Sequence, residues 1–545
     1  MTDTPQIPSA NSLESSPPSS SGRLRLFAIT LGLLVLAAGL RWYKIGDRDV
    51  WIDEANGVLI AMKSLPVLID RLKLDSSPPL YYFVLKVWML AFGESEAAIR
   101  SLSLLGGVAL TLSVLVLGRR WFSLEIGVIA ALLIATAPIQ IFYSQQARMY
   151  AWLPVAALWS FHWLGRAIRE GHARFLVYYA FCILAALYTH NYGLYLLPAQ
   201  AVIILFSGVL KKAPLRWCVC GLAVVLGYSP WTPVLLEQLR NSTHYSWFIP
   251  FWNEVGWHGA VKATLLSFAP GGEQPIYVGL PGANSISTYS ALTIVLLFLM
   301  GAGDCVGKKR SAERRSATRT LYAATLLPLL TALIASSILT PNYVPGRCDQ
   351  LVFPFFILSL AVGCGRLRPA ILRYIAVSAL LIFAIFGLKP HYQRPFHPSE
   401  RTLALDIAHR AQPDDVVLCT SLTRAPLEYY RMRFQIPIAL YSYPHDTAEH
   451  LGSQDDPMLL SQPDKLRAEA RALIKEIRES RGPRAHFFLV MEQTSTPRGF
   501  APSAVDRIFL DETEGMRKTR TLATVGTYTQ AGIGQAIVVT YVQLE

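Results

Sequence analysis

The stretch of sequence that decides the fold is residues 24–55, LRLFAITLGLLVLAAGLRWYKIGDRDVWIDEA. Its first part, residues 24–42, is an apolar run long enough to cross a lipid bilayer. No small-residue cleavage site follows, so we expect an uncleaved first span whose basic amino end faces the cytoplasm. The segment that contains the dipeptide Asp53-Glu54 would then emerge on the outer side of the membrane.

The composition of the whole chain is that of a membrane protein. Of its 545 residues, 52% are hydrophobic and only 16% are charged, which is too apolar for an ordinary soluble domain. The formal net charge is +13, but the cations gather in short clusters between apolar runs. Such clusters set membrane topology and meet anionic headgroups, so we expect membrane lipids and no nucleic acid among the partners.

Ten further apolar runs are long enough to span, which predicts a polytopic α-helical membrane protein with about eleven spans. The piece from Leu80 to Phe92 is shorter and carries Lys86 in its middle. It cannot span a bilayer as a helix and indicates a juxtamembrane half-helix. The ten runs lie near residues 99–117, 126–143, 150–168, 174–190, 193–210, 216–236, 288–304, 320–340, 348–364 and 370–388.

The distribution of basic residues supports this topology. With the half-helix left out of the spans, five connectors fall inside and together hold 17 lysines and arginines. The three short connectors that then face outward hold only Arg148 and Arg347. Because basic loops stay on the cytoplasmic side, counting the half-helix as a full span would invert this agreement for every later loop.

Three parts are expected along the chain. Residues 1–22 are rich in Ser and Pro and predict a disordered cytoplasmic tail. Residues 23–389 predict the transmembrane domain, with outer loops at 43–98 and 237–287. Residues 390–545 alternate strand-like and helical stretches and predict a small extracytoplasmic α/β domain. Its expected strands lie near 416–418, 486–490 and 536–541, and its expected helices near 422–433 and 464–480.

Asp53 and Glu54 are the first candidates for chemistry. A carboxylate at the outer membrane surface can take a proton from an acceptor that lies beside a lipid-borne substrate. The alternative is that Asp53 merely caps the helix that begins near Ala55. The surroundings favour the chemical interpretation, because an outer loop, a half-helix and two arginines share a side where cations are rare.

Arg148 and Arg347 are the second candidates. Each could be an interfacial side chain that reaches the lipid headgroups. A guanidinium also pairs with phosphate oxygens through two hydrogen bonds and keeps its charge in apolar surroundings, which suits a phosphate site. Lys86 could add a third cation, or it could turn to the headgroups.

Polar and aromatic residues near the same boundary are expected to line the site, although an interfacial aromatic belt gives a similar pattern. A divalent metal ion, or the acceptor, could bind at Glu94 and Glu96, which could equally start a helix. No certain cofactor is expected. The expected wall consists of Tyr81, Tyr82, Tyr143, Tyr150, His190, Asn191, Tyr192 and Tyr343.

Several short segments share the outer side of the membrane, and their order along the chain makes them specific as a set. They are Asp53-Glu54, Pro78-Pro79-Leu80-Tyr81-Tyr82, Phe92-Gly93-Glu94-Ser95-Glu96 with Ile99-Arg100, Ser144-Gln145-Gln146-Ala147-Arg148-Met149-Tyr150, and Arg347. Together they resemble the bacterial polyprenyl-phosphate-dependent glycosyltransferases of the GT-C class. These are akin to protein O-mannosyltransferases and to the aminoarabinose transferase of lipid A. The resemblance is strong over about residues 24–210, weaker to 390 and absent from the C-terminal domain.

The resemblance implies an inverting transfer of a hexosyl or pentosyl group from a polyprenyl phosphate to an acceptor hydroxyl. The reaction would occur on the outer side of the bacterial cytoplasmic membrane, on a protein, lipid or polysaccharide acceptor. The resemblance also implies Asp53 as the general base, with Glu54 beside it for positioning. Arg148 and Arg347 would then counter the charge that grows on the leaving phosphate.

The chain departs from the family pattern at two places. Ser77 stands where many relatives have His or Lys before Pro-Pro, and Arg347-Cys348-Asp349 stands where many have Arg-Tyr-Leu. Lys86 would be the cation that replaces the missing one. The phosphate contacts therefore match the family less closely than the base does.

Two other classes of function fit many spans with scattered polar residues. A transporter or flippase of lipid-linked sugars is the first, but neither paired broken spans in two matching halves nor a line of buried charges is evident in the sequence. A membrane scaffold that presents the C-terminal domain to a partner is the second. It would tolerate replacement of Asp53.

Overall fold

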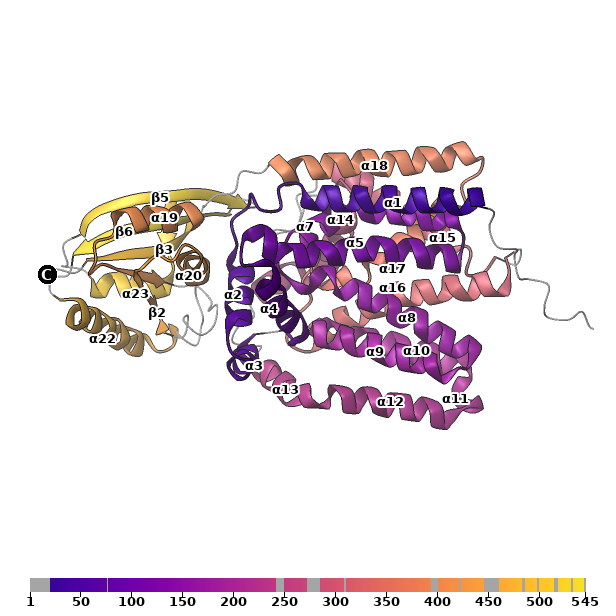
Figure 1. The fold of residues 1–545 in the computed structure, drawn as a ribbon, viewed down its shortest axis with the longest axis horizontal. Coiled ribbons are helices and arrows are strands. Elements are labelled where there is room, and N and C mark those ends of the chain that lie inside the picture. Colours follow the sequence, from indigo (N-terminus) through magenta and orange to yellow (C-terminus); the bar gives the residue numbers. More distant parts are fainter. Residues whose placement is uncertain are drawn as a thin grey trace, which may run out of the picture.

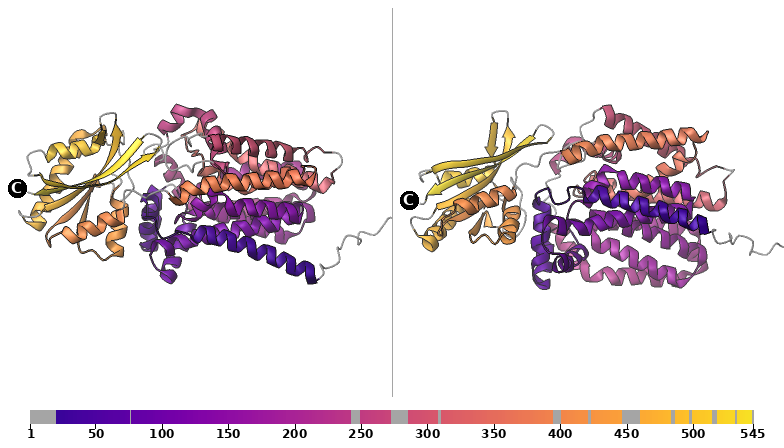
Figure 2. Two further views of the ribbon diagram at one scale, coloured as in Figure 1. Left: turned by 90° about the horizontal axis from the view of Figure 1, so that it is seen from above. Right: turned by 45° about the horizontal axis from the view of Figure 1, so that its top comes forward.

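The computed structural model divides the chain into a bundle of helices and a smaller domain with one β-sheet (Figure 1). Residues 20–393 build the bundle and residues 400–543 build the smaller domain. The long helices run side by side, and the sheet lies beyond one end of them (Figures 1 and 2). The structure describes residues 20–75, 77–241, 249–271, 285–307, 310–393, 400–420, 423–445, 460–482, 486–496, 499–513, 518–530 and 533–543.

A helix occurs at each of the eleven places where the sequence predicts a span. Local signals start them: Ser95 and Ser123 each accept a hydrogen bond from a backbone N–H of the first turn that follows. The bundle helices are α1 (Ser20–Trp42), α5 (Glu96–Trp121), α6 (Leu124–Thr136), α7 (Pro138–Ser144), α8 (Leu153–Glu170), α9 (Ala173–Thr189), α10 (Leu196–Ser207), α11 (Val209–Lys212), α12 (Pro214–Tyr228), α13 (Thr232–Asn241), α14 (Ile249–Phe268), α15 (Ser285–Ala302), α16 (Ala312–Ile338), α17 (Phe353–Cys364) and α18 (Ala370–Gln393).

Length and composition identify the helices that can cross a membrane. Six described helices qualify, namely α1, α5, the continuous pair α12 and α13, α15, α16 and α18. The pair α6 and α7, which is bent by 60°, makes a seventh if it is one broken span. The chain is therefore a multi-pass membrane protein, and the finer count of eleven spans stays a prediction.

The predicted outer loop 43–98 folds into three short helices, α2 (Ile52–Met62), α3 (Leu65–Leu74) and α4 (Leu80–Phe92). The bounds of α4 are those that the sequence predicts for the half-helix, and α4 ends at Gly93, whose φ of 84° suits glycine. These helices lie at the end of the bundle that faces the smaller domain, whereas α11 with its two lysines lies at the opposite end (Figure 1).

The bend between α6 and α7 follows from Pro138, which cannot continue the hydrogen-bond ladder of α6. Arg41, at the end of α1, is fully buried and donates to two carbonyls near the end of α6 at 3.0 and 3.1 Å. It also donates to Ser144 Oγ at 3.1 Å. Arg41 thus fixes the direction in which α7 leads into segment 145–150.

The smaller domain is an α/β structure with a mixed sheet in the order β2-β1-β3-β6-β5, to which β4 adds by pairing with β3. β1 runs parallel to β2 and β3, whereas β6 runs antiparallel to β3 and β5. The elements are α19 (Glu400–Arg410), β1 (Val416–Thr420), α20 (Arg424–Arg433), β2 (Ala439–Tyr443), α22 (Pro463–Arg481), β3 (His486–Thr496), β4 (Gly499–Pro502), α23 (Ala504–Glu512), β5 (Lys518–Gln530) and β6 (Ile533–Gln543).

The predicted strands of this domain lie within β1, β3 and β6, and the two predicted helices correspond to α20 and α22. α22 packs Leu466 and Ile474 onto one face of the sheet, together with Val416 and Phe487. β2, β4 and β5 are not predicted from the sequence. The first two are short, and β5 contains charged residues and a glycine that interrupt an apolar alternation.

Three predicted boundaries differ from the structure. α1 begins at Ser20, because a polar first turn can be helical, so the tail predicted as 1–22 ends earlier and its residues 1–19 lie outside the described residues. α18 continues to Gln393, past the predicted domain boundary at 390. The predicted loop 237–287 contains the end of α13 and all of α14, whose polar positions mask its helical pattern.

Candidate active site

Asp53 and Glu54 lie in the first turn of α2, but their side chains have different partners. Glu54 is fully buried, and its carboxylate accepts two hydrogen bonds from Arg100 at 2.9 and 2.7 Å. It also accepts from the backbone N–H of Ala147 at 2.6 Å and of Trp51 at 3.4 Å. Glu54, rather than Asp53, therefore caps the start of α2, and it holds that start against α5.

Asp53 keeps a partly open carboxylate, with 15% of its side chain exposed. Its Oδ2 lies 3.2 Å from Nη2 of Arg347, whose side chain is 19% exposed. The Arg347 guanidinium also lies over the rings of Trp51 and Tyr150, at 5.9 and 5.6 Å from their centroids. The fold thus brings the candidate base into contact with a candidate phosphate ligand from a distant part of the chain.

Arg148 reaches the same turn of α2 from segment 145–150. Its Nη1 donates to the backbone carbonyl of Asp53 at 3.2 Å and to the Tyr82 hydroxyl at 3.3 Å. Tyr82 in turn donates to Asp75 at 2.6 Å. Arg148 is only 6% exposed, and within the described part of the chain its Nε has no hydrogen-bond partner. A buried guanidinium with an unused donor is suited to bind an anion.

The aromatic residues beside this turn form a continuous set of ring contacts. The Tyr150 ring lies 5.0 Å from Tyr143 and 5.6 Å from His190, measured between centroids. His190 stacks on Tyr192 at 4.3 Å. Because Arg347 lies over the Tyr150 ring, this set of rings adjoins its ion pair with the candidate base through Tyr150.

Three other residues of the predicted wall join helices to one another. The Tyr81 hydroxyl lies 3.0 Å from a serine hydroxyl of α5, and the Asn191 amide donates to Gln238 of α13 at 3.0 Å. The Tyr343 hydroxyl donates to the Asp349 carboxylate at 3.2 Å. Tyr81, Asn191 and Tyr343 thus have hydrogen-bond partners within the protein, and their place in the wall of the site stays a prediction.

Lys86 and Glu96 each have partners within the protein. The Lys86 ammonium donates to the carbonyls of residues 61–63 at 3.1, 3.3 and 2.8 Å. It is thus bound to the C-terminal end of α2, where helix carbonyls attract a cation, and its role on a phosphate stays a prediction. Buried Glu96 pairs with Arg401 and Arg433 of the smaller domain instead of a metal or an acceptor. A divalent ion stays a prediction, since the described residues contain no cluster of three His, Cys, Asp or Glu that could hold one.

Sequence reasoning missed the roles of Arg100 and Arg41. Arg100 makes three further hydrogen bonds to backbone carbonyls of residues 45–49, at 2.8 to 2.9 Å. The sequence does contain a signal for a structural role, namely an arginine inside an otherwise apolar helix. Such an arginine must pair with a carboxylate or with several carbonyls when it is buried. The sequence does not say which carboxylate it finds.

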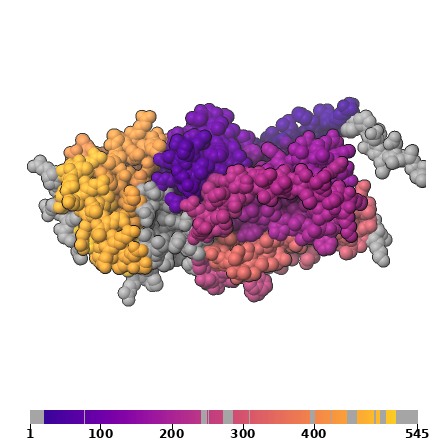
Figure 3. All heavy atoms as spheres, turned by 90° about the horizontal axis from the view of Figure 1, so that it is seen from below, coloured from indigo at the N-terminus to yellow at the C-terminus, as the bar shows by residue number. Residues whose placement is uncertain are grey.

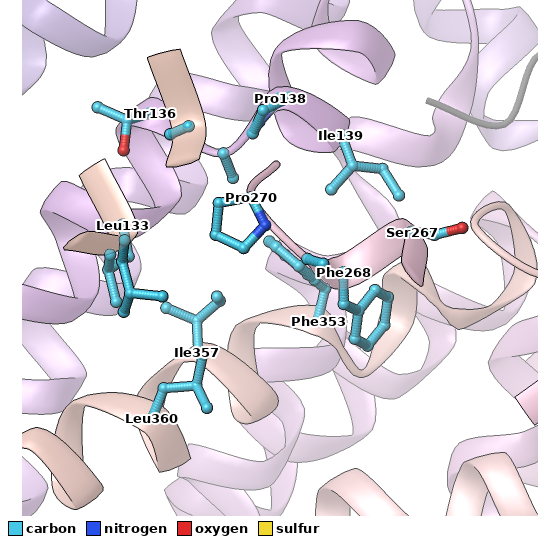
Figure 4. A pocket seen from close by; sticks show the side chains of 14 residues that line it. Leu133, Thr136, Pro138, Ile139, Ser267, Phe268, Pro270, Phe353, Ile357 and Leu360 are labelled. Carbon is cyan, nitrogen blue, oxygen red and sulfur yellow. The ribbon is translucent and has the colours of Figure 1, made fainter. Parts of the chain in front are cut away.

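A separate pocket lies beside the bend of α6 and α7, between α17 and α18 (Figure 4). Its lining is almost entirely apolar, with Leu133, Pro138, Phe268, Phe353 and Ile357 among the residues. It includes neither candidate carboxylate and neither candidate arginine. The pocket is therefore suited to an apolar group and not to proton transfer.

Part of the chain matches a known protein family by sequence. Residues 76–233 match the family model of dolichyl-phosphate-mannose-protein mannosyltransferase. The matched stretch contains Arg148 and His190, while Asp53 and Arg347 lie outside it. No curated protein sequence matches the chain.

Two solved proteins share the fold over most of this chain. ArnT from Cupriavidus metallidurans in the apo state is 13% identical, with a TM-score of 0.54 over 95% of this chain and 98% of that one. The same protein bound to undecaprenyl phosphate is 12% identical, with a TM-score of 0.53 over 96% and 98%. The archaeal oligosaccharyltransferase AglB from Archaeoglobus fulgidus, in complex with an inhibitory peptide and a dolichol-phosphate, is 12% identical, with a TM-score of 0.51 over 92% and 80%.

At these identities the likeness to the solved structures is one of fold. The family match adds a sequence signal for the part of the chain from just before α4 to the start of α13. The resemblance found in the sequence is thus confirmed: residues 76–233 match the mannosyltransferase family, within a chain that has the fold of GT-C glycosyltransferases.

Proposed function

We propose that this chain is a membrane glycosyltransferase that moves a sugar from a polyprenyl phosphate to an acceptor hydroxyl, with inversion at the anomeric carbon. The observation that carries the proposal is the 3.2 Å contact between the Asp53 carboxylate and the Arg347 guanidinium, both partly exposed. A group for the proton and a group for the phosphate are thereby within reach of one substrate. The fold shared with ArnT bound to undecaprenyl phosphate supports this donor class.

In the proposed step, Asp53 takes the proton of the acceptor hydroxyl as its oxygen attacks the anomeric carbon. The bond from that carbon to the phosphate oxygen breaks, and its electron pair leaves with the polyprenyl phosphate. One base is sufficient, because the phosphate leaves as a stable anion and needs little help from an acid. The unused donor of Arg148 and the guanidinium of Arg347 would stabilise the charge that develops on the phosphate.

Arg347 can pair either with Asp53, as in this structure, or with a bound phosphate. Asp53 and a donor phosphate are both anionic, so they compete for the same guanidinium. If the phosphate binds Arg347, the Asp53 carboxylate is released from the ion pair and can accept a hydrogen bond from the acceptor hydroxyl. Donor binding would thereby prepare Asp53 for the acceptor, which favours an order in which the donor binds first.

The sidedness of the reaction follows from the charge distribution. Asp53 lies at the end of the bundle opposite to α11 and its two lysines (Figure 1). Because basic connectors stay inside, we propose that Asp53 and the smaller domain face the extracytoplasmic side of a bacterial cytoplasmic membrane. The acceptor would then be a protein, a lipid or a polysaccharide of the cell envelope.

The test is reconstitution of the full chain in liposomes with a polyprenyl-phosphate sugar that carries a radioactive label. A glycosyltransferase releases free polyprenyl phosphate and transfers the label to an acceptor from the envelope. A flippase moves the labelled lipid across the bilayer and leaves the sugar on it. Movement of intact donor without transfer, under conditions in which the protein binds the donor, would contradict the proposal.

A further inference from the structure

The smaller domain touches the bundle at the segment that leads into α2. Arg401, in the first turn of α19, donates its backbone N–H to the Asp49 carboxylate at 2.9 Å. Its guanidinium donates to the carbonyl of Gly46 at 3.3 Å and to the buried carboxylate of Glu96. Arg433, at the end of α20, pairs with the same Glu96 carboxylate. Arg401 therefore binds the segment that leads into α2, and both arginines bind Glu96 at the start of α5.

Two tyrosines of α20 make further hydrogen bonds, one to the segment that leads into α2 and one to the residues before α5. The Tyr430 hydroxyl accepts the backbone N–H of Val50 at 2.8 Å, and the Tyr429 hydroxyl donates to the carbonyl of Glu94 at 2.6 Å. Burial raises the pKa of Tyr430, so its hydroxyl keeps its proton. Figure 3 shows this part of the smaller domain, in orange, directly against the indigo segment of the first hundred residues.

The opposite side of the same segment is held by the bundle. Arg100 of α5 donates to the carbonyls of Ile45, Arg48 and Asp49, and with its remaining donors to Glu54. The backbone from 45 to 50 thus lies between Arg100 on one side and the smaller domain on the other. It ends at Val50, two residues before the start of α2 at Ile52 and three residues before Asp53.

We propose that the smaller domain positions the catalytic base, with Arg401 and Tyr430 as positioning residues that act on Asp53 through residues 49–50. This inference rests on the proposed function. The two residues touch backbone and carboxylate groups of the entry segment and are assigned no contact with the substrate. Their effect on transfer would come from where they place the start of α2.

A small displacement of the Asp53 carboxylate is sufficient to lower the rate of sugar transfer strongly. A misplacement of about 1 Å, caused by a change remote from the reacting atoms, can lower a rate about 100-fold. The bonds of Arg100 to Glu54 and to the entry segment remain when Arg401 or Tyr430 is changed. The bundle should therefore stay folded while the start of α2 loses one of its two supports.

The experiment uses the purified full chain with Arg401→Ala and with the milder Tyr430→Phe. We expect kcat to fall about 10- to 100-fold for Arg401→Ala and less for Tyr430→Phe, while donor binding stays within about twofold. The matched control is Arg410→Ala, which removes an arginine of the same helix whose side chain is 47% exposed and pairs only with its neighbour Asp406 among the bonds described. Its transfer rate should equal that of the unchanged protein.

A double-mutant cycle separates positioning of the base from general stability. If Arg401 acts through Asp53, adding Arg401→Ala to Asp53→Asn lowers the residual rate no further. Multiplicative losses, unchanged kcat in both single variants, or a loss of donor binding that matches the loss of rate would overturn the inference. Normal transfer by Asp53→Asn alone would instead contradict the proposed function, so the two failures are distinguishable.

Discussion

Gly107 of α5 supports the bend that carries Arg148, and a single methyl group there should disturb it. A Cβ built at Gly107 lies 2.1 Å from Ser144 Oγ and 2.4 Å from Arg41 Nε, which are hydrogen-bonded to each other. Ordinary contacts of a Cβ begin at about 3.4 Å. Gly107→Ala therefore forces both groups away from the new methyl group, each by roughly 1 Å, and disrupts their hydrogen bond.

The cost can be worked from these contacts. Overpacking in a filled interior costs about 1–3 kcal/mol, and a lost hydrogen bond to a charged group costs about 1.5–3 kcal/mol more. We expect Gly107→Ala to lose about 2.5–6 kcal/mol of stability and to unfold at a clearly lower temperature, measured by tryptophan fluorescence of the purified protein. The transfer rate should also fall, because Ser144 is the last residue of α7 and directly precedes segment 145–150, which contains Arg148.

Gly39→Ala is the matched control for this experiment. Gly39 lies in α1 near Arg41, and a Cβ built there meets nothing within 4 Å. Alanine is the better helix former, so this variant should be as stable as the unchanged protein or slightly more stable. If Gly107→Ala unfolds at the same temperature as Gly39→Ala, the packing of Arg41 against α5 and α7 is not as described.

Arg347→Gln and Arg148→Gln should each weaken donor binding about 10- to 100-fold, because each removes a charged hydrogen bond worth about 1.5–3 kcal/mol. Binding of a labelled polyprenyl phosphate measures this affinity. Equal affinity in both variants and the unchanged protein would exclude a phosphate site at these arginines. Lys86→Met should lower the unfolding temperature and leave donor affinity unchanged, since the ammonium binds carbonyls at the end of α2; lost affinity with normal stability would return Lys86 to the phosphate site. The topology can be tested in a background without the seven native cysteines. Lys63→Cys should react with an impermeant thiol reagent added outside intact cells, and Ala312→Cys should not. The reverse labelling pattern would overturn the proposed topology.

The positions of the helices were predictable because hydrophobic runs and their ends are written locally in the sequence. α4 is the clearest case, since thirteen residues between Pro79 and Gly93, all but Lys86 apolar or aromatic, allow a helix with nearly fixed bounds. The candidate residues Asp53, Arg148 and Arg347 were predictable for a related reason. Each is a charged group at a boundary where apolar or uncharged residues are the rule.

Partners across the fold were not predictable from one sequence. Adjacent carboxylates gave no local sign that Glu54 would pair with Arg100 while Asp53 stays partly open. Lys86 likewise has the sequence environment of a phosphate ligand, and only the position of α2 shows that helix carbonyls use its donors. The contact of Arg401 with Glu96 depends on how two domains meet, which helical and strand periodicity do not encode.

The most direct measurement is the single-turnover rate of sugar transfer by Asp53→Asn, with donor binding measured on the same sample. The control is Asp70→Asn, which changes a carboxylate of the same outer segment whose side chain is 67% exposed. Loss of a general base should lower the rate about 10²- to 10⁴-fold while donor binding persists, and Asp70→Asn should transfer normally. A rate for Asp53→Asn close to that of Asp70→Asn would show that Asp53 is not the base.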